Sequence, residues 1–322
     1  MQPPFVRRLT CRSRAISAEP PRRRHRMYLS SPLPPRRYVL CGRSCAPPLR
    51  TTPGGRELRR PRKPLMNTPR TDAPTVSIVI ATYHRCARLQ RCIARIRENV
   101  RIPREIIVVG GSRGDGTEEW AAAQEDIRFI RETAREGATR AYNKGFRAAV
   151  GRYVMWLNDD SYPLPGAIEA AVGMIERPEL SDVGMIAFYH NENRRWNKLD
   201  TIERDGESYS IYNVRGRPYA NFGLLRRDLL ARLGYLDERY YFCAWDPDLA
   251  LKVQLEAGLL VVGCRAALVY HEELIDDRKS ADMAVIDRDN EKLFAKWPLP
   301  EKFAYSDPAP AYRELLAARG LT

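Results

Sequence analysis

The sequence contains no long hydrophobic run. Its best candidate, residues 258–270, is about 13 residues long and is interrupted by Arg265, whereas a helix that crosses a bilayer needs about 20 apolar residues. We therefore interpret this stretch as two short buried strands and predict no membrane-spanning helix.

The cysteines lack the spacing of a metal site. The seven cysteines form an odd set, and the closely spaced Cys41 and Cys45 have no second pair that would complete a four-ligand zinc site. Reduced thiols are the plain interpretation. Together with the lack of a spanning run, they predict a cytoplasmic protein, either free or peripheral at the inner face of the membrane.

Residues 71–322 lack the excess of positive charge that the whole chain carries. The chain has a net charge of +14, but residues 1–70 hold 18 Lys and Arg against two acids, which leaves residues 71–322 at −2. A basic surface is the electrostatic signature of nucleic-acid binding. No nucleic-acid partner is therefore expected for the folded part of the chain.

The first 72 residues lack a sustained helical or strand period. Thirteen of the 24 prolines precede residue 71, and such a composition is typical of a disordered extension. Three interpretations stay open. The extension is an Arg-rich arm that binds RNA or anionic lipid, or a transit-like peptide, although its prolines oppose an amphipathic helix. Alternatively, it is an upstream extension of the reading frame, with Met27 or Met66 as the true start.

From Val76 onward, short apolar runs alternate with helical segments, the pattern of βα units and a mostly parallel sheet. The pattern predicts strands at about 76–81, 105–110, 127–131, 152–158, 183–189, 218–224 and 259–270, and helices at about 86–99, 116–124, 137–149, 164–176, 226–233 and 247–257. We expect an irregular excursion over 190–217, in which one hairpin could form. A short helix is expected at 310–320, in an end of the chain that docks weakly or stays mobile. An α/β domain is thus predicted over residues 73–297, followed by a tail over 298–322.

The clearest chemical signal is a hydrophobic strand that ends in carboxylates. Residues 153–157 are followed by Asn158, Asp159 and Asp160, and open α/β sheets bind ligands at the carboxyl ends of their strands. Oxygen ligands of this kind suit Mg²⁺ or Mn²⁺ carrying a diphosphate. The alternative is that Asp159 and Asp160 only cap the next helix or shape a turn.

Five segments, in this order and spacing, resemble the family-2 glycosyltransferases. They are VSIVIATYHR (76–85), EIIVVGGSRGDGT (105–117), REGATRAYNKG (135–145), WLNDDSYPLPGA (156–167), and NFGLLRRDLL with GYLDERYYFCAWDPDLALKV (221–253). The resemblance implies a GT-A-like three-layer sandwich around a mostly parallel central sheet. It also implies inverting, metal-dependent transfer of a hexosyl or deoxyhexosyl group. The donor would be a UDP-, GDP- or dTDP-sugar, and the acceptor a glycan or a lipid-linked hydroxyl.

The resemblance assigns the nucleotide to the first strand and the loop after it. There, Thr82 and Tyr83 match positions that contact base or ribose. The segment after the second strand departs from the family pattern, which carries an acid where this chain has Gly110. Glycines at 110 and 111 could instead let backbone amides approach the ligand. In that case, restoring Asp at position 110 would change the nucleotide preference.

The resemblance also assigns the metal site. Asn158 and Asp160 match the family's Asp-x-Asp motif in its Asn-x-Asp variant. Asp160 is then the ligand of Mg²⁺ or Mn²⁺, and Asn158 and Asp159 lie beside the donor. His271 matches a late histidine that completes the metal shell, although a lone histidine is also a common structural residue.

Asp246 matches the first Asp of the family motif Glu-Asp-x-Asp-Leu, which is the general base of inverting members. From the residues alone, Asp246 followed by Pro247 is also a good helix N-cap. Trp245 replaces the motif's Glu and could offer a sugar-stacking surface. Other aromatic residues in the second half of the chain could also stack on sugars: Trp196, Tyr212, Tyr219, Tyr240 and Tyr241.

Two other functions stay open. A sugar-phosphate nucleotidyltransferase uses a similar sheet, but it usually begins with a Gly-rich loop bearing Lys or Arg, which residues 81–84 lack. A catalytically impaired glycosyltransferase-like binding module would explain Gly110 and Trp245. It would not explain the retained Asp160, Asp246 and His271.

Overall fold

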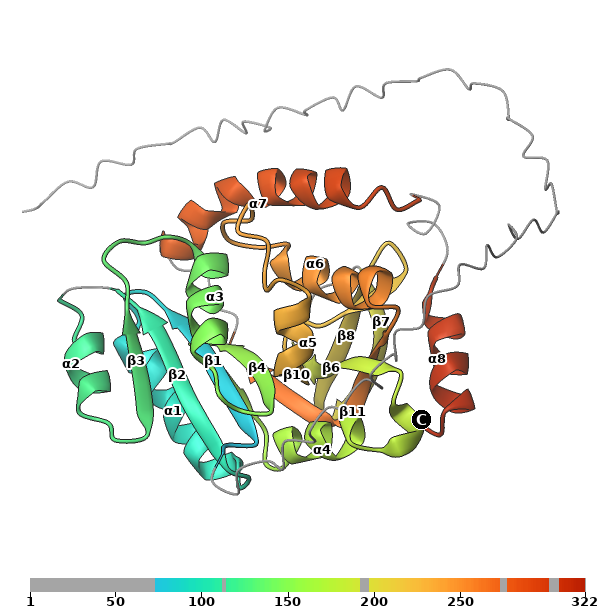
Figure 1. Cartoon of the computed structure of the whole chain (residues 1–322), viewed down its shortest axis with the longest axis horizontal. Coiled ribbons are helices and arrows are strands. Elements are labelled where there is room, and N and C mark those ends of the chain that lie inside the picture. The colour runs from blue at the N-terminus through green and yellow to red at the C-terminus, as the bar shows by residue number, and fades with distance from the viewer. Residues whose placement is uncertain (1–72, 112–113, 192–196, 273–276, 301–306, 322) are drawn as a thin grey trace, which may run out of the picture. The chain divides into compact units, whose positions relative to one another are not determined.

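The computed structural model describes residues 73–321, except for 112–113, 192–196, 273–276 and 301–306 (Figure 1). These residues belong to one unit that spans Met66–Thr322. The three interpretations of the N-terminal extension, and the candidate Trp196, lie outside the described residues. Within the described part, no helix is long and apolar enough to cross a bilayer.

A mixed sheet, eleven-stranded within the described residues, forms the centre of the unit. The strands are β1 (Val76–Thr82), β2 (Arg104–Gly110), β3 (Ile127–Arg131), β4 (Tyr153–Asn158), β5 (Ser161–Pro163), β6 (Val183–His190), β7 (Lys198–Arg204), β8 (Glu207–Val214), β9 (Arg217–Tyr219), β10 (Gly223–Arg226) and β11 (Leu260–His271). Their main order is β3-β2-β1-β4-β10-β6-β11-β5, and β7 and β9 join through β8. β1 to β4 pair in parallel, as do β6 and β11, whereas β10 and β5 are antiparallel to their neighbours.

Helices cover both faces of this sheet (Figure 1). They are α1 (Cys86–Asn99), α2 (Thr117–Ala122), α3 (Ala138–Ala148), α4 (Ala167–Ile175), α5 (Arg227–Arg232), α6 (Trp245–Leu251), α7 (Asp277–Lys296) and α8 (Ala309–Ala318), with a short 3₁₀ turn at Pro178–Leu180 and a π-helical turn at Lys252–Glu256 that continues α6. α3 packs on β1 and β2, whereas α4 packs on β6, β10 and β11. The result is the helix–sheet–helix layering expected of an α/β protein.

The spacing of small and apolar residues explains this packing. Four residues of α1 are buried at the spacing i, i+3, i+4, i+7, which puts them on one helix face: Leu89, Cys92, Ile93 and Ile96. α3 approaches β1 so closely that a Cβ atom at Gly145 would lie 2.3 Å from Val79 Cγ1. A side chain at position 145 would therefore push the helix away from the sheet.

The strand directions bring several strand ends to one edge of the sheet. β1, β2, β4, β6 and β11 run toward this edge, and β10 starts there because it is antiparallel to β4 and β6. The last residues of the five strands are Thr82, Gly110, Asn158, His190 and His271. Four of the predicted site residues thus meet at the edge where α/β sheets bind ligands.

Three predicted strand features were wrong. Residues 260–271 form one strand, β11, with an irregular register between Cys264 and Leu268, rather than two strands. The predicted strand 218–224 is divided between β9 and β10, because the chain turns between them. The segment expected to be irregular instead contains the antiparallel meander β7-β8-β9, in which β8 also pairs with β6 through His190 and Ser210.

The C-terminal part also differs from the prediction. No helix was predicted over 277–296, because α7 is rich in charged residues and shows no clear apolar stripe. The predicted helix near the C-terminus is present, but the prediction that it docks weakly was wrong. Tyr312 and Leu316, one helical turn apart on α8, are buried, and the Tyr312 hydroxyl accepts a hydrogen bond from the Gly263 amide at 2.7 Å.

Candidate active site

Asp159 and Asp160 form the tight turn between β4 and β5, and both are buried. The next helix, α4, begins only at Ala167, with Gly166 as its N-cap and no side-chain cap. The two acids therefore do not cap that helix. They do shape a turn, but their side chains reach across the edge of the sheet to residues of other elements.

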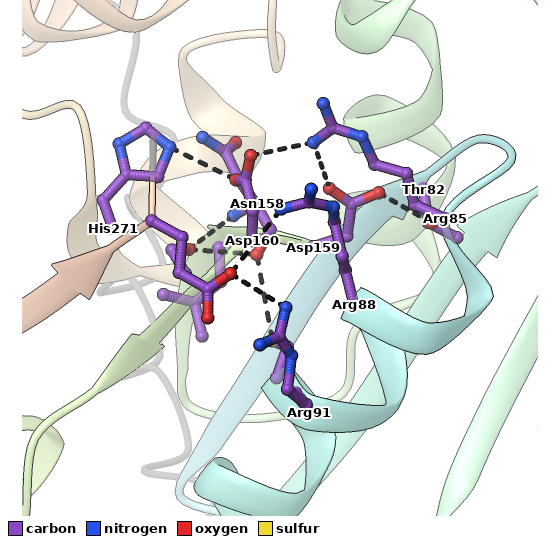
Figure 2. Close-up of polar contacts among 12 residues, drawn as sticks. Thr82, Arg85, Arg88, Arg91, Asn158, Asp159, Asp160 and His271 are labelled. Atoms are coloured by element: carbon purple, nitrogen blue, oxygen red, sulfur yellow. Dashed lines mark hydrogen bonds and ion pairs between the residues drawn. The ribbon is translucent and has the colours of Figure 1, made fainter. Parts of the chain in front are cut away.

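Arg85 lies against both carboxylates (Figure 2). Its Nη1 atom is 2.8 Å from Asp160 Oδ2 and 3.1 Å from Asp159 Oδ1, and all three side chains are almost fully buried. Arg85 is the N-cap residue of α1, so the start of this helix holds the guanidinium over the turn. Two adjacent buried carboxylates need nearby positive charge to stay ionised, and Arg85 supplies it.

His271 reaches the same carboxylate from the end of β11. Its Nε2 atom lies 3.2 Å from Asp160 Oδ1. The antiparallel pairing of β5 with β11 sets His271 opposite Ser161, and the Glu272 amide donates to the Asp160 carbonyl at 2.9 Å. Sheet pairing thus brings together two residues that are more than 100 positions apart in the sequence.

The charges around the turn set its ionisation. Burial opposes ionisation of Asp160, but His271 and Arg85 outweigh it and hold the pKa of this carboxyl well below its usual range. Burial, together with the two acids, raises the pKa of the Cys92 thiol. Cys92 therefore stays a neutral thiol under the turn, whereas Asp160 stays a carboxylate.

The donor set at this edge fits a divalent cation that also binds phosphate. One carboxylate oxygen of Asp160 and an imidazole nitrogen of His271 lie 3.2 Å apart. The carboxylate suits Mg²⁺ or Mn²⁺, and neutral imidazole is a common ligand of divalent transition metals. Within the described residues, no group of three or more His, Cys, Asp and Glu could hold a metal alone. Mg²⁺ is commonly held by one or two protein ligands and completed by substrate phosphates, so two ligands suffice.

The predicted nucleotide residues surround the turn. Thr82 Oγ1 donates to Asp159 Oδ2 at 2.8 Å, and Asn158 Oδ1 accepts a hydrogen bond from the Tyr142 hydroxyl at 3.0 Å. The Tyr83 ring is half-buried in the loop after β1, with the Arg135 guanidinium 5.1 Å from its centre. An aromatic face beside a cation at this edge can contact a base.

Gly110 is explained by packing. A Cβ atom at this position would lie 2.8 Å from Thr82 Cγ2 and 2.9 Å from the Thr82 carbonyl oxygen. Even alanine is therefore too large unless β1 shifts. Because the contact includes backbone, Asp at 110 would also disturb β1, besides the change in nucleotide preference expected from the sequence.

Asp246 lies within the first turn of α6. The N-cap of this helix is Ala244, which makes no side-chain cap, so the alternative that Asp246 is an N-cap was wrong. The Asn221 side-chain amide donates to Asp246 Oδ2 at 3.1 Å, and the Asn221 carbonyl accepts a hydrogen bond from Trp156. Asn221 therefore ties Asp246 to the end of β4.

A chain of contacts connects Asp246 with Asp160. Asn221 Oδ1 lies 3.1 Å from His190 Nε2, and the rings of His190 and His271 are 6.4 Å apart. His271 in turn contacts Asp160. The predicted metal ligand Asp160 and the predicted general base Asp246 thus belong to one connected group of side chains at the edge where the strands end.

The predicted stacking surfaces are largely core residues. Trp245 is buried, and its ring lies 4.8 Å from that of Tyr142 and 5.6 Å from that of Trp156. Trp245 therefore fixes α6 on the sheet, and the suggestion that it stacks on sugars was wrong. Three of the other aromatic candidates, Tyr212, Tyr219 and Tyr240, are also buried. Tyr241 is half-buried.

Sequence reasoning missed three residues of this group: Arg85, His190 and Asn221. Arg85 ends the first of the five segments and stands at a helix start, which is a usable signal for a residue beside the nucleotide loop. Asn221 starts the fifth segment, but only the antiparallel pairing of β10 with β4 shows that it lies next to the acids.

Residues 77–234 match the family model described as glycosyl transferase family 2. The chain carries a family-2 glycosyltransferase domain. Relatives of this chain are found among bacterial proteins. The "Uncharacterized glycosyltransferase YwdF" of Bacillus subtilis (strain 168) is 28% identical over 230 residues, which cover 67% of this chain and 83% of that protein. The "Uncharacterized glycosyltransferase RT0329" of Rickettsia typhi (strain ATCC VR-144 / Wilmington) is 28% identical over 141 residues, 42% of each chain.

This glycosyltransferase resembles two solved structures. GalNAc-T7 with UDP, GalNAc and Mn²⁺ has a TM-score of 0.51 at 12% identity, over 79% of this chain and 55% of that chain. The mannosyltransferase PcManGT from Pyrobaculum calidifontis, in complex with GDP-Man and Mn²⁺, has a TM-score of 0.49 at 20% identity, over 77% of this chain and 76% of that chain. The family match and the first of these structures confirm the predicted GT-A-like α/β fold.

Proposed function

We propose that this glycosyltransferase is metal-dependent and inverting. It transfers a hexosyl or deoxyhexosyl group from a UDP-, GDP- or dTDP-sugar to a hydroxyl of a glycan or lipid-linked acceptor. The observation that carries the proposal is the contact chain from Asp160 through His271, His190 and Asn221 to Asp246. It joins a phosphate-side acid and a proton-accepting acid at one edge of the sheet.

Asp160 and His271 are the residues that would hold the metal ion. The GalNAc-T7 structure, which shares the fold, contains Mn²⁺ with UDP. This supports a divalent cation, Mn²⁺ or Mg²⁺, in the present protein. When bound, the cation neutralises charge on the departing diphosphate. Arg85, already in contact with Asp160, adds a fixed positive charge beside the same group.

Asp246 is the proposed general base. A carboxylate that accepts the proton of the acceptor hydroxyl as the new bond forms contributes about 10²–10⁴-fold to the rate. Asn221 holds Oδ2 of this carboxylate and so fixes its direction. A single displacement at the anomeric carbon, with acceptor and leaving group on opposite faces, inverts its configuration.

The nucleotide binds, in this proposal, between the ends of β1 and β4. Thr82, Tyr83, Gly110, Asn158 and Asp159 line that position. Gly110 approaches Thr82 so closely that there is no room for a side chain at position 110. This position therefore has no side chain to contact the nucleoside. Recognition of the base therefore depends on the Tyr83 ring and on backbone groups. We assign the catalytic domain to residues 73–297.

Two assays on the full chain test the proposal. A thermal-shift screen of UDP, GDP and dTDP, each with and without Mn²⁺, should show stabilisation by one nucleotide that depends on the metal, since binding to the native state raises stability. Release of that nucleotide from its sugar donors should stop on addition of EDTA. A nucleotidyltransferase would instead consume a sugar phosphate and a nucleoside triphosphate, and a binding module would show the thermal shift without release.

A further inference from the structure

One carboxylate of α7, outside the residues that match the family model, is buried against the backbone of another segment. Asp289 is fully buried. Its Oδ2 atom accepts hydrogen bonds from three consecutive amides, those of Tyr241 at 3.0 Å, Phe242 at 2.8 Å and Cys243 at 3.2 Å. Consecutive amides that converge on one point form a concave anion site, and here a side chain of the same protein fills it.

These amides belong to the loop that leads into the proposed general base. Ala244 follows them with a φ of 66°, in the left-handed region that residues with a Cβ rarely adopt. Such a conformation persists only where the surroundings hold it. Trp245 and Asp246 come next, as the first two residues of α6. The conformation of residues 241–244 therefore decides where α6 starts and where Asp246 points.

Further contacts of α7 support the same segment. Lys292 donates to Asp289 Oδ1 at 2.9 Å and to the Arg239 carbonyl at 2.6 Å. Lys296 and Trp297 contact the buried Asp248 on α6 at 2.8 Å and 2.7 Å. These contacts fix the two ends of the segment, whereas Asp289 binds its middle, directly before the left-handed residue.

The chemistry of Asp289 makes this role specific. A carboxylate only accepts hydrogen bonds, so one oxygen can receive three amides at once. Asparagine has nearly the same shape, but its NH₂ group would face either these amides or Lys292, which are all donors. The change from Asp to Asn therefore removes the convergent site without opening a cavity.

We propose that Asp289 is a positioning residue for the general base: it fixes residues 241–243 and through them the direction of Asp246. The inference rests on the proposed function, because it needs Asp246 to act as the base. It gives α7, which lies outside the residues of the family match, a role in positioning the general base.

The test compares Asp289→Asn with Asp228→Asn in the full chain. Asp228 is an exposed acid in the first turn of α5, so it matches the chemical change without touching the site. In Asp289→Asn, exchange of the amides of 241–243 should become at least about tenfold faster, as expected for loss of a hydrogen bond to a charged group. Exchange of the β1 amides should not change.

The second part of the test measures the kinetics of donor cleavage. The donors are sugar derivatives of the nucleotide, UDP, GDP or dTDP, that stabilises the wild type. The kcat for donor cleavage should fall about 10²-fold, the usual effect of misplacing a catalytic group by about 1 Å. The dissociation constant of the nucleotide should stay unchanged. Asp228→Asn should match the wild type in both parts. Should Asp289→Asn not fold, Lys292→Met should show a smaller loss of kcat in the same direction. It removes the cation beside Asp289 and the hydrogen bond to the Arg239 carbonyl but keeps the three amide contacts of Asp289.

Three results would overturn the inference. They are unchanged exchange at 241–243, faster exchange with an unchanged kcat, and faster exchange throughout the protein with weaker nucleotide binding, which would mark a purely structural residue. A wild type that cleaves no donor contradicts the proposed function itself. That failure is visible before any variant is compared, so the two failures are distinguishable.

Discussion

Nη1 of Arg85 lies 2.8 Å from Oδ2 of Asp160, whereas His271 approaches the other oxygen of this carboxylate, Oδ1. The same nitrogen is 3.1 Å from Asp159, so one guanidinium compensates both buried carboxylates. A divalent ion that binds Asp160 must share it with Arg85 or displace Arg85. The nucleotide diphosphate, which attracts both cations, decides how the charges are arranged once the donor binds.

Replacing Arg85 by Met should strengthen binding of Mn²⁺ to the nucleotide-free protein. The change keeps the length of the side chain and removes the competing charge, so we expect at least about tenfold tighter binding from the lost repulsion alone. The metal-free variant should also be less stable, by about 3–5 kcal/mol, because buried carboxylates lose their partner. Free Mn²⁺ measured by electron paramagnetic resonance gives the affinity, and thermal unfolding with and without Mn²⁺ gives the stability.

Arg91→Met is the matched control for this experiment. Arg91 is on the same helix but is largely exposed and pairs with Glu272 rather than with the acids. Its replacement should leave both Mn²⁺ affinity and stability near the wild-type values. Unchanged Mn²⁺ affinity in Arg85→Met would mean that the ion does not bind at Asp160.

Asp246→Asn should separate catalysis from donor binding. Asparagine keeps the shape of the side chain and cannot accept the acceptor proton, so kcat should fall by about 10²–10⁴-fold. Nucleotide affinity should be retained, because neither Asp246 nor Asn221, which holds it, is among the residues proposed to line the nucleotide. Kinetics of donor cleavage together with calorimetric titration of the nucleotide measures both. Equal loss of kcat and affinity would remove Asp246 from the role of base.

Much of the fold could be read from local patterns. The strands β1 to β4 and the helices α1 and α3 were predicted within a residue or two, because each shows clean apolar periodicity. α7 was missed since it is held by polar contacts such as that of Asp289, which leave no apolar stripe. The meander after His190 was missed because its pairings, such as that of Tyr212 with Tyr219, become apparent only in three dimensions.

The candidate site was predictable in its acids but not in its partners. Asp160 and Asp246 stand out because they lie within recognisable segments, and His271 because it ends an apolar strand. Arg85 and Asn221 act through contacts across the sheet, at separations of 75 and 25 positions from their acids. The sequence also does not show which aromatic residues are buried. Trp245 was a candidate for stacking on a sugar, but in the structure it packs between Tyr142 and Trp156.

Replacing Gly110 by Ala should destabilise the protein rather than tune its specificity. The new Cβ would meet Thr82 Cγ2 at 2.8 Å and the Thr82 carbonyl oxygen at 2.9 Å, and overpacking of this kind costs about 1–3 kcal/mol. Urea denaturation measures the loss. Thr82→Ser, which removes Cγ2, should recover only part of it in the double variant, because the backbone contact persists. Full recovery would show that β1 can move, and an unchanged free energy of unfolding in Gly110→Ala would contradict the packing argument.

The stability that Asp160 provides should depend on pH in the metal-free protein. His271 and Arg85 hold its folded-state pKa well below the usual range, whereas an unfolded Asp titrates near about 3.9. A lowered folded pKa means that the ionised carboxyl stabilises the native state above about pH 4, and that this contribution shrinks as the pH falls toward the folded value. The free energy of unfolding of wild type, relative to Asp160→Asn, should therefore decrease by about 1 kcal/mol between pH 4 and pH 3. Urea titrations in EDTA measure this difference. The same comparison in an Arg85→Met background should show a smaller decrease, because one of the two groups that lower the pKa is gone. A difference that stays constant from pH 5 to pH 3 would mean that Asp160 gains nothing from its two neighbours on folding.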